Sequence, residues 1–176
     1  MGSARTSAPL LPIALAGAAG IWAGGLVAVP MVPAPITLQT LALVLCGGLF
    51  GVRAGALAGA AFLAAVLAGA PILSGGASAG GAAFLELKTA GFVLAFVPAG
   101  ALAGLAVGRW RQDAALFLLA HLVVVVAGFT WLALRTGLSV SDGVASIAAL
   151  VPGALVKSAV GAAAVRALGE RRGPDA

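Results

Sequence analysis

Charged side chains within apolar stretches are the first candidates for binding chemistry in this sequence. Lys157 lies in the apolar run of residues 144–168, and Glu86 and Lys88 lie two positions apart at the start of another apolar run. A charge inside a membrane segment is costly unless it is paired, so each of the three is a candidate ligand-binding residue. Lys157 could alternatively extend its ammonium to the lipid headgroups, and Glu86 and Lys88 could form a solvated helix start.

A group of hydroxyl and amide side chains follows three closely spaced prolines. Pro30, Pro33 and Pro35 forbid a helix and predict an extended hairpin, after which come Thr37 and Gln39. Thr37 could cap the next helix. Gln39 has no such role, and its amide offers both a donor and an acceptor to a ligand. We therefore expect Gln39, with Thr37 beside it, to contact a ligand at this end of the helix.

The remaining reactive residue types exclude several kinds of chemistry. The single cysteine, Cys46, and the single histidine, His121, are far apart in sequence, which excludes an internal disulfide and a Cys/His zinc cluster. His121 is expected to be a packed, hydrogen-bonded helix residue near the cytoplasmic face. A catalytic pairing of Ser74 or Ser78 with His121 fails because these positions belong to opposite faces of the membrane. We therefore expect no enzymatic activity, no metal site and no cofactor.

The composition indicates which elements must carry these residues. Of 176 residues, 62% are hydrophobic and 9% are charged, against about 25% charged in soluble domains. A helix needs about 20 apolar residues to span a bilayer, so the chain has room for roughly six spans and no separate soluble domain. The net charge of +5 comes without a dense basic stripe or an aromatic platform, which argues against nucleic-acid binding. The sequence predicts an all-α integral membrane protein with a single domain, residues 1–176, in the lipid bilayer.

Proline, glycine and charge clusters divide the chain into six predicted transmembrane helices. They span residues 10–29, 37–50, 54–70, 86–107, 114–134 and 152–169. Pro152 suits the first turn of a helix and disfavours a helix interior, so residues 141–151 are predicted to form a separate short outer helix. Ser141 or Asp142 would cap that helix. This division places Lys157 in the second turn from the outer face.

The basic residues orient the predicted spans. Seven of the ten fall on the side that holds both termini, namely Arg5, Arg53, Arg109, Arg111, Arg166, Arg171 and Arg172. Positive residues collect in cytoplasmic loops, so both termini are expected in the cytoplasm. The glycine-rich loop 71–83, which contains Gly75, then faces outward and is expected to act as a flexible gate. Glu86 is the carboxylate expected to pair with Lys157 in the empty protein.

The first predicted helix carries small residues over much of its surface. Ala14 and Ala18 lie four residues apart among several glycines and alanines. Small residues at this spacing allow two helices to approach closely. Ala14 and Ala18 could therefore pack inside the bundle, or they could form the docking surface for a partner subunit, which is the alternative that we predict.

Four stretches of the sequence resemble motifs of one transporter family. Residues 32–40 read Val-Pro-Ala-Pro-Ile-Thr-Leu-Gln-Thr and resemble the V-P-x-T-L-Q-T entry to helix 2 of the BioY family, the substrate-binding (S) components of energy-coupling factor (ECF) biotin transporters. Residues 70–76, 128–132 and 152–157 resemble the family's A-x-P-V-F-x-G, G-x-x-W-L and P-G-D-x-x-K motifs, in the family's order. The sequence departs from the family's motifs at two sites. Ala154 replaces an aspartate, and residues 87–92 lack the proline and tyrosine of the G-P-T-G-G-Y motif.

The resemblance implies biotin uptake by a six-helix bundle in the bacterial plasma membrane, with a ligand pocket at its outer end. Lys157 or Lys88 would bind the carboxylate or carbonyl of the ligand. Gln39 and Thr37 would bind its ureido edge, and Phe92 would pack against its ring. The implied partners are an ECF transmembrane coupling subunit and two ATPases, so ATP hydrolysis would lie outside this chain. An S component for another biotin-like vitamin and a ligand-free membrane scaffold are the alternatives.

Overall fold

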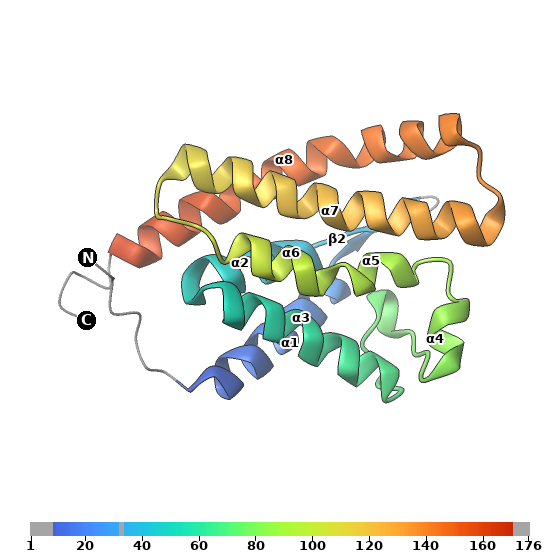
Figure 1. Ribbon diagram of the computed structural model, residues 1–176, viewed down its shortest axis with the longest axis horizontal. Helices are drawn as coiled ribbons and strands as arrows, with labels where there is room; N and C mark the ends of the chain where they lie inside the picture. Colours follow the sequence, from blue (N-terminus) through green and yellow to red (C-terminus); the bar gives the residue numbers. More distant parts are fainter. Residues whose placement is uncertain (1–8, 32–33, 171–176) are drawn as a thin grey trace.

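The computed structural model of the protein describes residues 9–31 and 34–170 and is a bundle of helices with one short hairpin (Figure 1). In chain order, its elements are α1 (Leu10–Leu26), β1 (Ala28–Val29), β2 (Ile36–Thr37), α2 (Gln39–Phe50), α3 (Val52–Leu67), the 3-10 turn η1 (Ser74–Gly76), α4 (Ala82–Glu86), α5 (Ala90–Leu94), α6 (Phe96–Ala103), α7 (Trp110–Thr136) and α8 (Val140–Glu170).

The proline-rich segment forms the expected hairpin over the part of it that the structure describes. Strands β1 and β2 pair antiparallel, with Ala28 opposite Thr37 and Val29 opposite Ile36. Pro33 lies outside the described residues. The Leu38 N–H donates to the Gly24 carbonyl oxygen at 3.0 Å. This bond ties the start of α2 to the end of α1, and it fixes the position of the polar residues that begin α2.

The predicted helix of residues 86–107 is wrong as a single element. The structure has α4, an extended break at Leu87 (φ −65°, ψ 132°), and then α5 and α6 in succession. The division between α5 and α6 has a local cause in Pro98, which has no N–H to donate to the carbonyl of Leu94, the last residue of α5. Residues 87–89, at the start of the predicted helix, therefore form a connection between α4 and α5, and this connection lies beside the cavity described below.

The predicted break at Pro152 is also wrong, because α8 is continuous from Val140 to Glu170 with Pro152 inside it. A proline removes one backbone hydrogen bond, and membrane helices tolerate that loss when neighbouring groups compensate for it. Ser139 precedes the helix and caps it, since its Oγ accepts from the Asp142 N–H at 3.2 Å and donates to the Asp142 carboxylate at 2.6 Å. The predicted caps, Ser141 and Asp142, lie inside α8 instead. Lys157 consequently lies near the middle of a long helix instead of two turns from its end.

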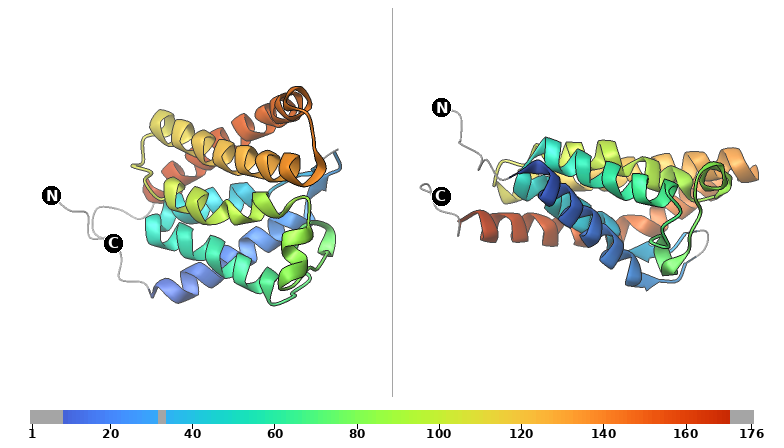
Figure 2. Two further views of the ribbon diagram at one scale, coloured as in Figure 1. Left: turned by 45° about the vertical axis from the view of Figure 1, so that its right-hand side comes forward. Right: turned by 90° about the horizontal axis from the view of Figure 1, so that it is seen from below.

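The helices pack in an order that Figures 1 and 2 show from three directions. Helix α1 lies against α2 and α3, α3 against α6, and α7 against α8. The α3–α6 contact depends on glycine, since a Cβ atom built on Gly55 would lie 2.1 Å from the carbonyl oxygen of Gly100. Such small residues let two helix backbones approach closely. Gly55 and Gly100 therefore set the distance between these two helices.

The part of the α1 surface that holds Ala14 and Ala18 faces into the bundle, which corrects the assignment of these two residues to a docking surface. Ala14 is only 3% exposed, and Ala18 packs against the core. Between them, a Cβ atom on Gly17 would lie 2.6 Å from both Cys46 Sγ and Ala58 Cβ. Ala14 and Ala18 are therefore packing residues of the α1 interface with α2 and α3.

Two helices, α7 and α8, are long and apolar enough to cross a bilayer, over Trp110–Thr136 and Val140–Gly169. Four further apolar helices are shorter, namely Leu10–Leu26, Gln39–Phe50, Val52–Leu67 and Ala90–Ala103. In Figure 1 the first turn of α1 and the last turn of α8 lie at the same end of the bundle, while α4 and the α7–α8 connection lie at the opposite end.

Candidate ligand-binding site

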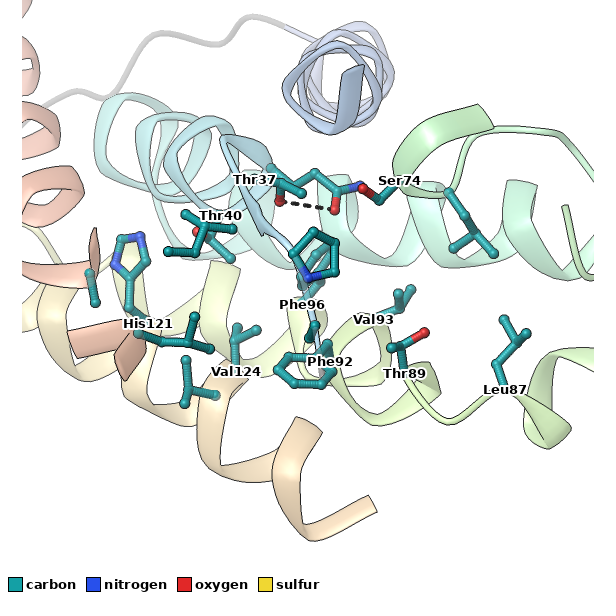
Figure 3. A pocket seen from close by; sticks show the side chains of 18 of the residues that line it. Thr37, Thr40, Ser74, Leu87, Thr89, Phe92, Val93, Phe96, His121 and Val124 are labelled. Carbon is teal, nitrogen blue, oxygen red and sulfur yellow. Dashed lines mark hydrogen bonds between the residues drawn. The ribbon is translucent and has the colours of Figure 1, made fainter. Parts of the chain in front are cut away.

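A cavity of about 270 Å³ lies among the hairpin, α2, the loop after α3, and helices α5 to α8. Figure 3 shows labelled side chains from the hairpin, α2, η1, α5, α6 and α7 arranged around this space. Most of its wall is apolar, with a few polar groups, as is usual in small-molecule sites. The polar lining side chains are Thr37, Gln39, Thr40, Ser74, Ser78, Thr89, His121 and Lys157. Thr37, Gln39, Phe92 and Lys157 are the predicted site residues that the fold brings together here.

The Lys157 side chain reaches the cavity from α8, and its hydrogen bonds hold α8 to the start of α2. Its Nζ donates to the Thr40 Oγ1 atom at 2.8 Å and to the Thr37 carbonyl oxygen at 3.2 Å. Both partners are neutral, and no carboxylate lines the cavity among the described residues. The ammonium is thus a positive charge without an anionic partner in the wall, which makes it a site for an acceptor group of a ligand.

Gln39 begins α2 and lies almost completely buried, at 7% exposed. Its Oε1 accepts from the Thr37 hydroxyl at 3.2 Å, which orients the amide. Its Nε2 is buried and has no hydrogen-bond partner within the described part of the chain. Because buried polar groups are normally paired, the Gln39 Nε2 atom, which lies beside Gly25 of α1, is a donor that lacks its usual partner.

His121 on α7 lines the cavity and is 1% exposed. Its Nδ1 lies 2.7 Å from the Phe117 carbonyl oxygen and 3.2 Å from Ser158 Oγ, which donates to the Ala154 carbonyl oxygen at 2.7 Å. The expectation of a packed, hydrogen-bonded histidine is confirmed for Nδ1. Its position in the same cavity as Ser74 and Ser78 corrects the expectation that His121 lies at the opposite face from these two serines.

Aromatic side chains form one wall of the cavity. Phe92 and Phe96 both line it, and the Phe92 ring meets Phe129 edge-on, with centroids 5.5 Å apart and planes at 75°. A Cβ atom on Gly128 would lie 2.3 Å from the Phe92 ring, so only glycine leaves room for this position. Trp131 Nε1 donates to the Leu87 carbonyl oxygen at 2.9 Å and thereby ties the α4–α5 connection to α7. These contacts with α7 hold the Phe92 side chain in its position at the cavity.

Three predicted site residues lie outside the cavity lining. Glu86 has a side chain 74% exposed and forms an ion pair with Arg135, so its predicted pairing with Lys157 is wrong. Lys88 is exposed on the connection between α4 and α5. Gly75 lies in η1 with φ +75°, and its neighbour Ser74 lines the cavity instead. Glu86 and Lys88 turn outward because the chain is extended at Leu87, where a continuous helix was expected.

The residues that sequence reasoning missed come mainly from distant helices. The further lining residues include Thr40, Ser74, Thr89, Phe96, His121, Val124, Leu150 and Ala154. Thr40 ends the stretch of residues 32–40 that resembles the family motif, and its spacing from Thr37 could have identified it. The sequence offers no signal that brings His121 on α7 and Ser158 on α8 together, because that contact depends on how the two helices cross.

A helical bundle with a partly open, mostly apolar cavity is the class of protein that this geometry defines. The family model described as "BioY family" matches residues 3–173, and the chain belongs to this family.

Curated relatives carry corresponding names. In an alignment 177 positions long, the chain is 33% identical to the biotin transporter BioY of Rhodobacter capsulatus. The alignment covers 87% of this chain and 92% of that one. The chain is 35% identical to the probable biotin transporter BioY of Bacillus subtilis over 136 residues, which covers 74% of this chain and 72% of that one.

A solved structure has the same fold. It is described as the S-component for biotin from an ECF-type ABC transporter, and it matches with a TM-score of 0.82 and 28% sequence identity. The match covers 92% of this chain and 90% of the other. The family is one of transporter components and not of enzymes, and its members are membrane proteins.

Proposed function

We propose that this protein captures biotin as the S component of an ECF-type transporter. The observation that carries the proposal is the chemistry of the cavity, which combines an ammonium without an anionic partner, an unpaired amide donor and an aromatic wall. Biotin offers a carboxylate, a ureido group and an apolar ring and chain, and each has a counterpart in the wall. The names of the relatives and of the matching structure support the same ligand.

The same proposal includes a membrane arrangement. The two long and four shorter apolar helices would form six spans in the bacterial plasma membrane. Both termini would lie in the cytoplasm, since the first turn of α1 and the last turn of α8 share one end of the bundle and the basic residues favour that side. The cavity would then open outward. An ECF coupling subunit and ATPases would supply the energy, as the description of the matching structure suggests.

Mass spectrometry of small molecules that co-purify with the protein tests this function. Protein expressed in cells supplied with biotin should carry it in a ratio near one to one after purification in detergent. Another vitamin in its place would favour a sister carrier with a different ligand. A protein free of any vitamin, which also fails to bind added biotin, would favour the scaffold alternative.

We predict that the loop of residues 71–83 closes over the ligand. Leu73, Ser74 and Ala77 line the cavity from this loop, whereas Gly75 and Gly76 have positive φ angles of 75° and 78° and nothing within 4 Å of a built Cβ. Loops that close over ligands have low local stability when they are open. Hydrogen exchange of this loop should slow when saturating biotin is added. Equal exchange with and without ligand would remove the gate.

Glu86→Ala should change biotin affinity by less than about twofold, because exposed ion pairs contribute little. The residue pairs with Arg135 at the surface and does not line the cavity. Isothermal titration of biotin into the variant and the wild type measures the effect. A clear rise in affinity would instead mean that Glu86 competes with the ligand for Lys157.

A further inference from the structure

We propose that His121 is a ligand-binding residue whose Nε2 atom accepts a hydrogen bond from an N–H group of the ligand. The recognised chemistry is a cyclic amide or urea, and the inference rests on the proposed capture of biotin, whose ureido ring carries two such N–H groups. His121 lies at one end of the cavity, on the side of Thr40, as Figure 3 shows.

The hydrogen bonds of the ring determine which nitrogen carries the proton. The Phe117 carbonyl oxygen can only accept, so Nδ1, at 2.7 Å from it, must be the donor. Ser158 Oγ is also within reach of Nδ1 but donates its own hydrogen to the Ala154 carbonyl oxygen, which leaves it as a second acceptor. Both neighbours of Nδ1 can accept a hydrogen bond from it, so they favour the tautomer that carries its proton on Nδ1.

The opposite nitrogen is then an unpaired acceptor. His121 is 1% exposed, and its Nε2 is buried with no hydrogen-bond partner among residues 9–31 and 34–170. A second proton on the ring would create a buried cation in a wall that holds Lys157 and no described carboxylate. The neutral ring is thus favoured, and its Nε2 presents a lone pair that a donor from the ligand can satisfy.

The neighbouring donor makes this end of the cavity selective for an amide-like edge. Ser158, which contacts the His121 ring, directly follows Lys157, whose ammonium lines the same cavity. A urea presents a carbonyl acceptor beside an N–H donor, which complements the Lys157 donor and the His121 acceptor together. A carboxylate presents acceptors alone and would leave Nε2 unpaired. His121 would thus select for a ligand N–H that Lys157 cannot recognise.

Nitrogen NMR of the imidazole tests the inference without changing the protein. His121 is the single histidine of the chain, so protein labelled with ¹⁵N-histidine and prepared without a histidine tag gives one Nδ1 and one Nε2 resonance. In the empty protein, Nε2 should resonate as an unprotonated nitrogen and Nδ1 as a protonated one. Saturating biotin should shift Nε2 in the direction of an accepted hydrogen bond. A protonated Nε2, or an Nε2 resonance that biotin leaves unchanged, would overturn the proposal.

Paired variants and a ligand analogue give a second test. His121→Asn keeps a donor near the Nδ1 position and removes the acceptor, so biotin affinity should fall about tenfold. His121→Gln places an amide oxygen near the Nε2 position and should lose less. Biotin methylated at both ureido nitrogens should bind much more weakly than biotin to the wild type, and the difference should shrink in His121→Asn.

The outcomes separate this inference from the proposed function. Wild-type protein that binds biotin, combined with an Asn variant that loses no affinity and discriminates the methylated ligand fully, would overturn the role of His121 alone. Wild-type protein that does not bind biotin would overturn the proposed function and the inference with it.

Discussion

Lys157→Ala is expected to weaken biotin binding at least about tenfold, equivalent to about 1.4 kcal/mol. The ammonium is the one cation among the described cavity-lining residues, and it bonds there only to the neutral groups of Thr37 and Thr40. A ligand carbonyl or carboxylate would receive a charge-assisted hydrogen bond from it, which is stronger than a neutral one. Isothermal titration calorimetry in detergent measures the loss.

Val156→Ala is the matched control for this variant. Val156 precedes Lys157 on α8, is 63% exposed and does not line the cavity, so its truncation should leave affinity unchanged. Unchanged affinity in Lys157→Ala as well would mean that the lysine serves only to hold α8 to the start of α2. Equal losses in both variants would point to a general disturbance of α8.

Gly55→Ala is expected to destabilise the protein by about 3 kcal/mol, the upper part of the range for overpacked sites. The added methyl group would lie 2.1 Å from the Gly100 carbonyl oxygen and 2.8 Å from the Gly47 Cα atom, which are both backbone atoms. Helices α3 and α6 would have to separate, because neither backbone can yield alone. For a chain of this size the melting temperature should fall on the order of 10 °C, measured by thermal unfolding in detergent.

Gly20→Ala is the control for this substitution. Its built Cβ would lie 3.7 Å from the Ala42 Cβ, which is ordinary contact. Alanine also favours the helical state over glycine, so this variant should be as stable as the wild type or slightly more stable. Equal melting temperatures for Gly55→Ala and the wild type would contradict the close approach of α3 and α6.

The three N-terminal helices could be predicted nearly to their ends because strong local signals bound them. The predicted spans 10–29, 37–50 and 54–70 correspond to Leu10–Leu26, Gln39–Phe50 and Val52–Leu67, and the intervening prolines and glycines stop each helix locally. At Pro152 the presence of a proline wrongly predicted a helix end. The loss of one backbone hydrogen bond costs less than the packing of the long helix α8 along α7 contributes. At residues 87–89 the opposite occurred, because the helix predicted from residue 86 is interrupted there although none of these three residues is a proline.

The candidate site could be predicted where its residues are neighbours in sequence. Thr37 and Gln39 follow a hairpin that fixes them locally, and Lys157 is an isolated charge in an apolar run. His121 and Ser158 are distant in sequence, and their contact exists only through the crossing of α7 and α8. Glu86 was misassigned because its proximity to a helix start says nothing of the direction in which its side chain points, and Arg135, a residue of α7, holds it outward.

Equilibrium binding of radiolabelled biotin to the purified protein tests the central claim most directly. We predict saturable binding to one site per chain, displaced by unlabelled biotin, unaffected by an excess of thiamine or riboflavin, and weakened in Lys157→Ala but not in Val156→Ala. Absence of saturable biotin binding by folded wild-type protein, or displacement by the unrelated vitamins as effectively as by biotin, would contradict the assignment.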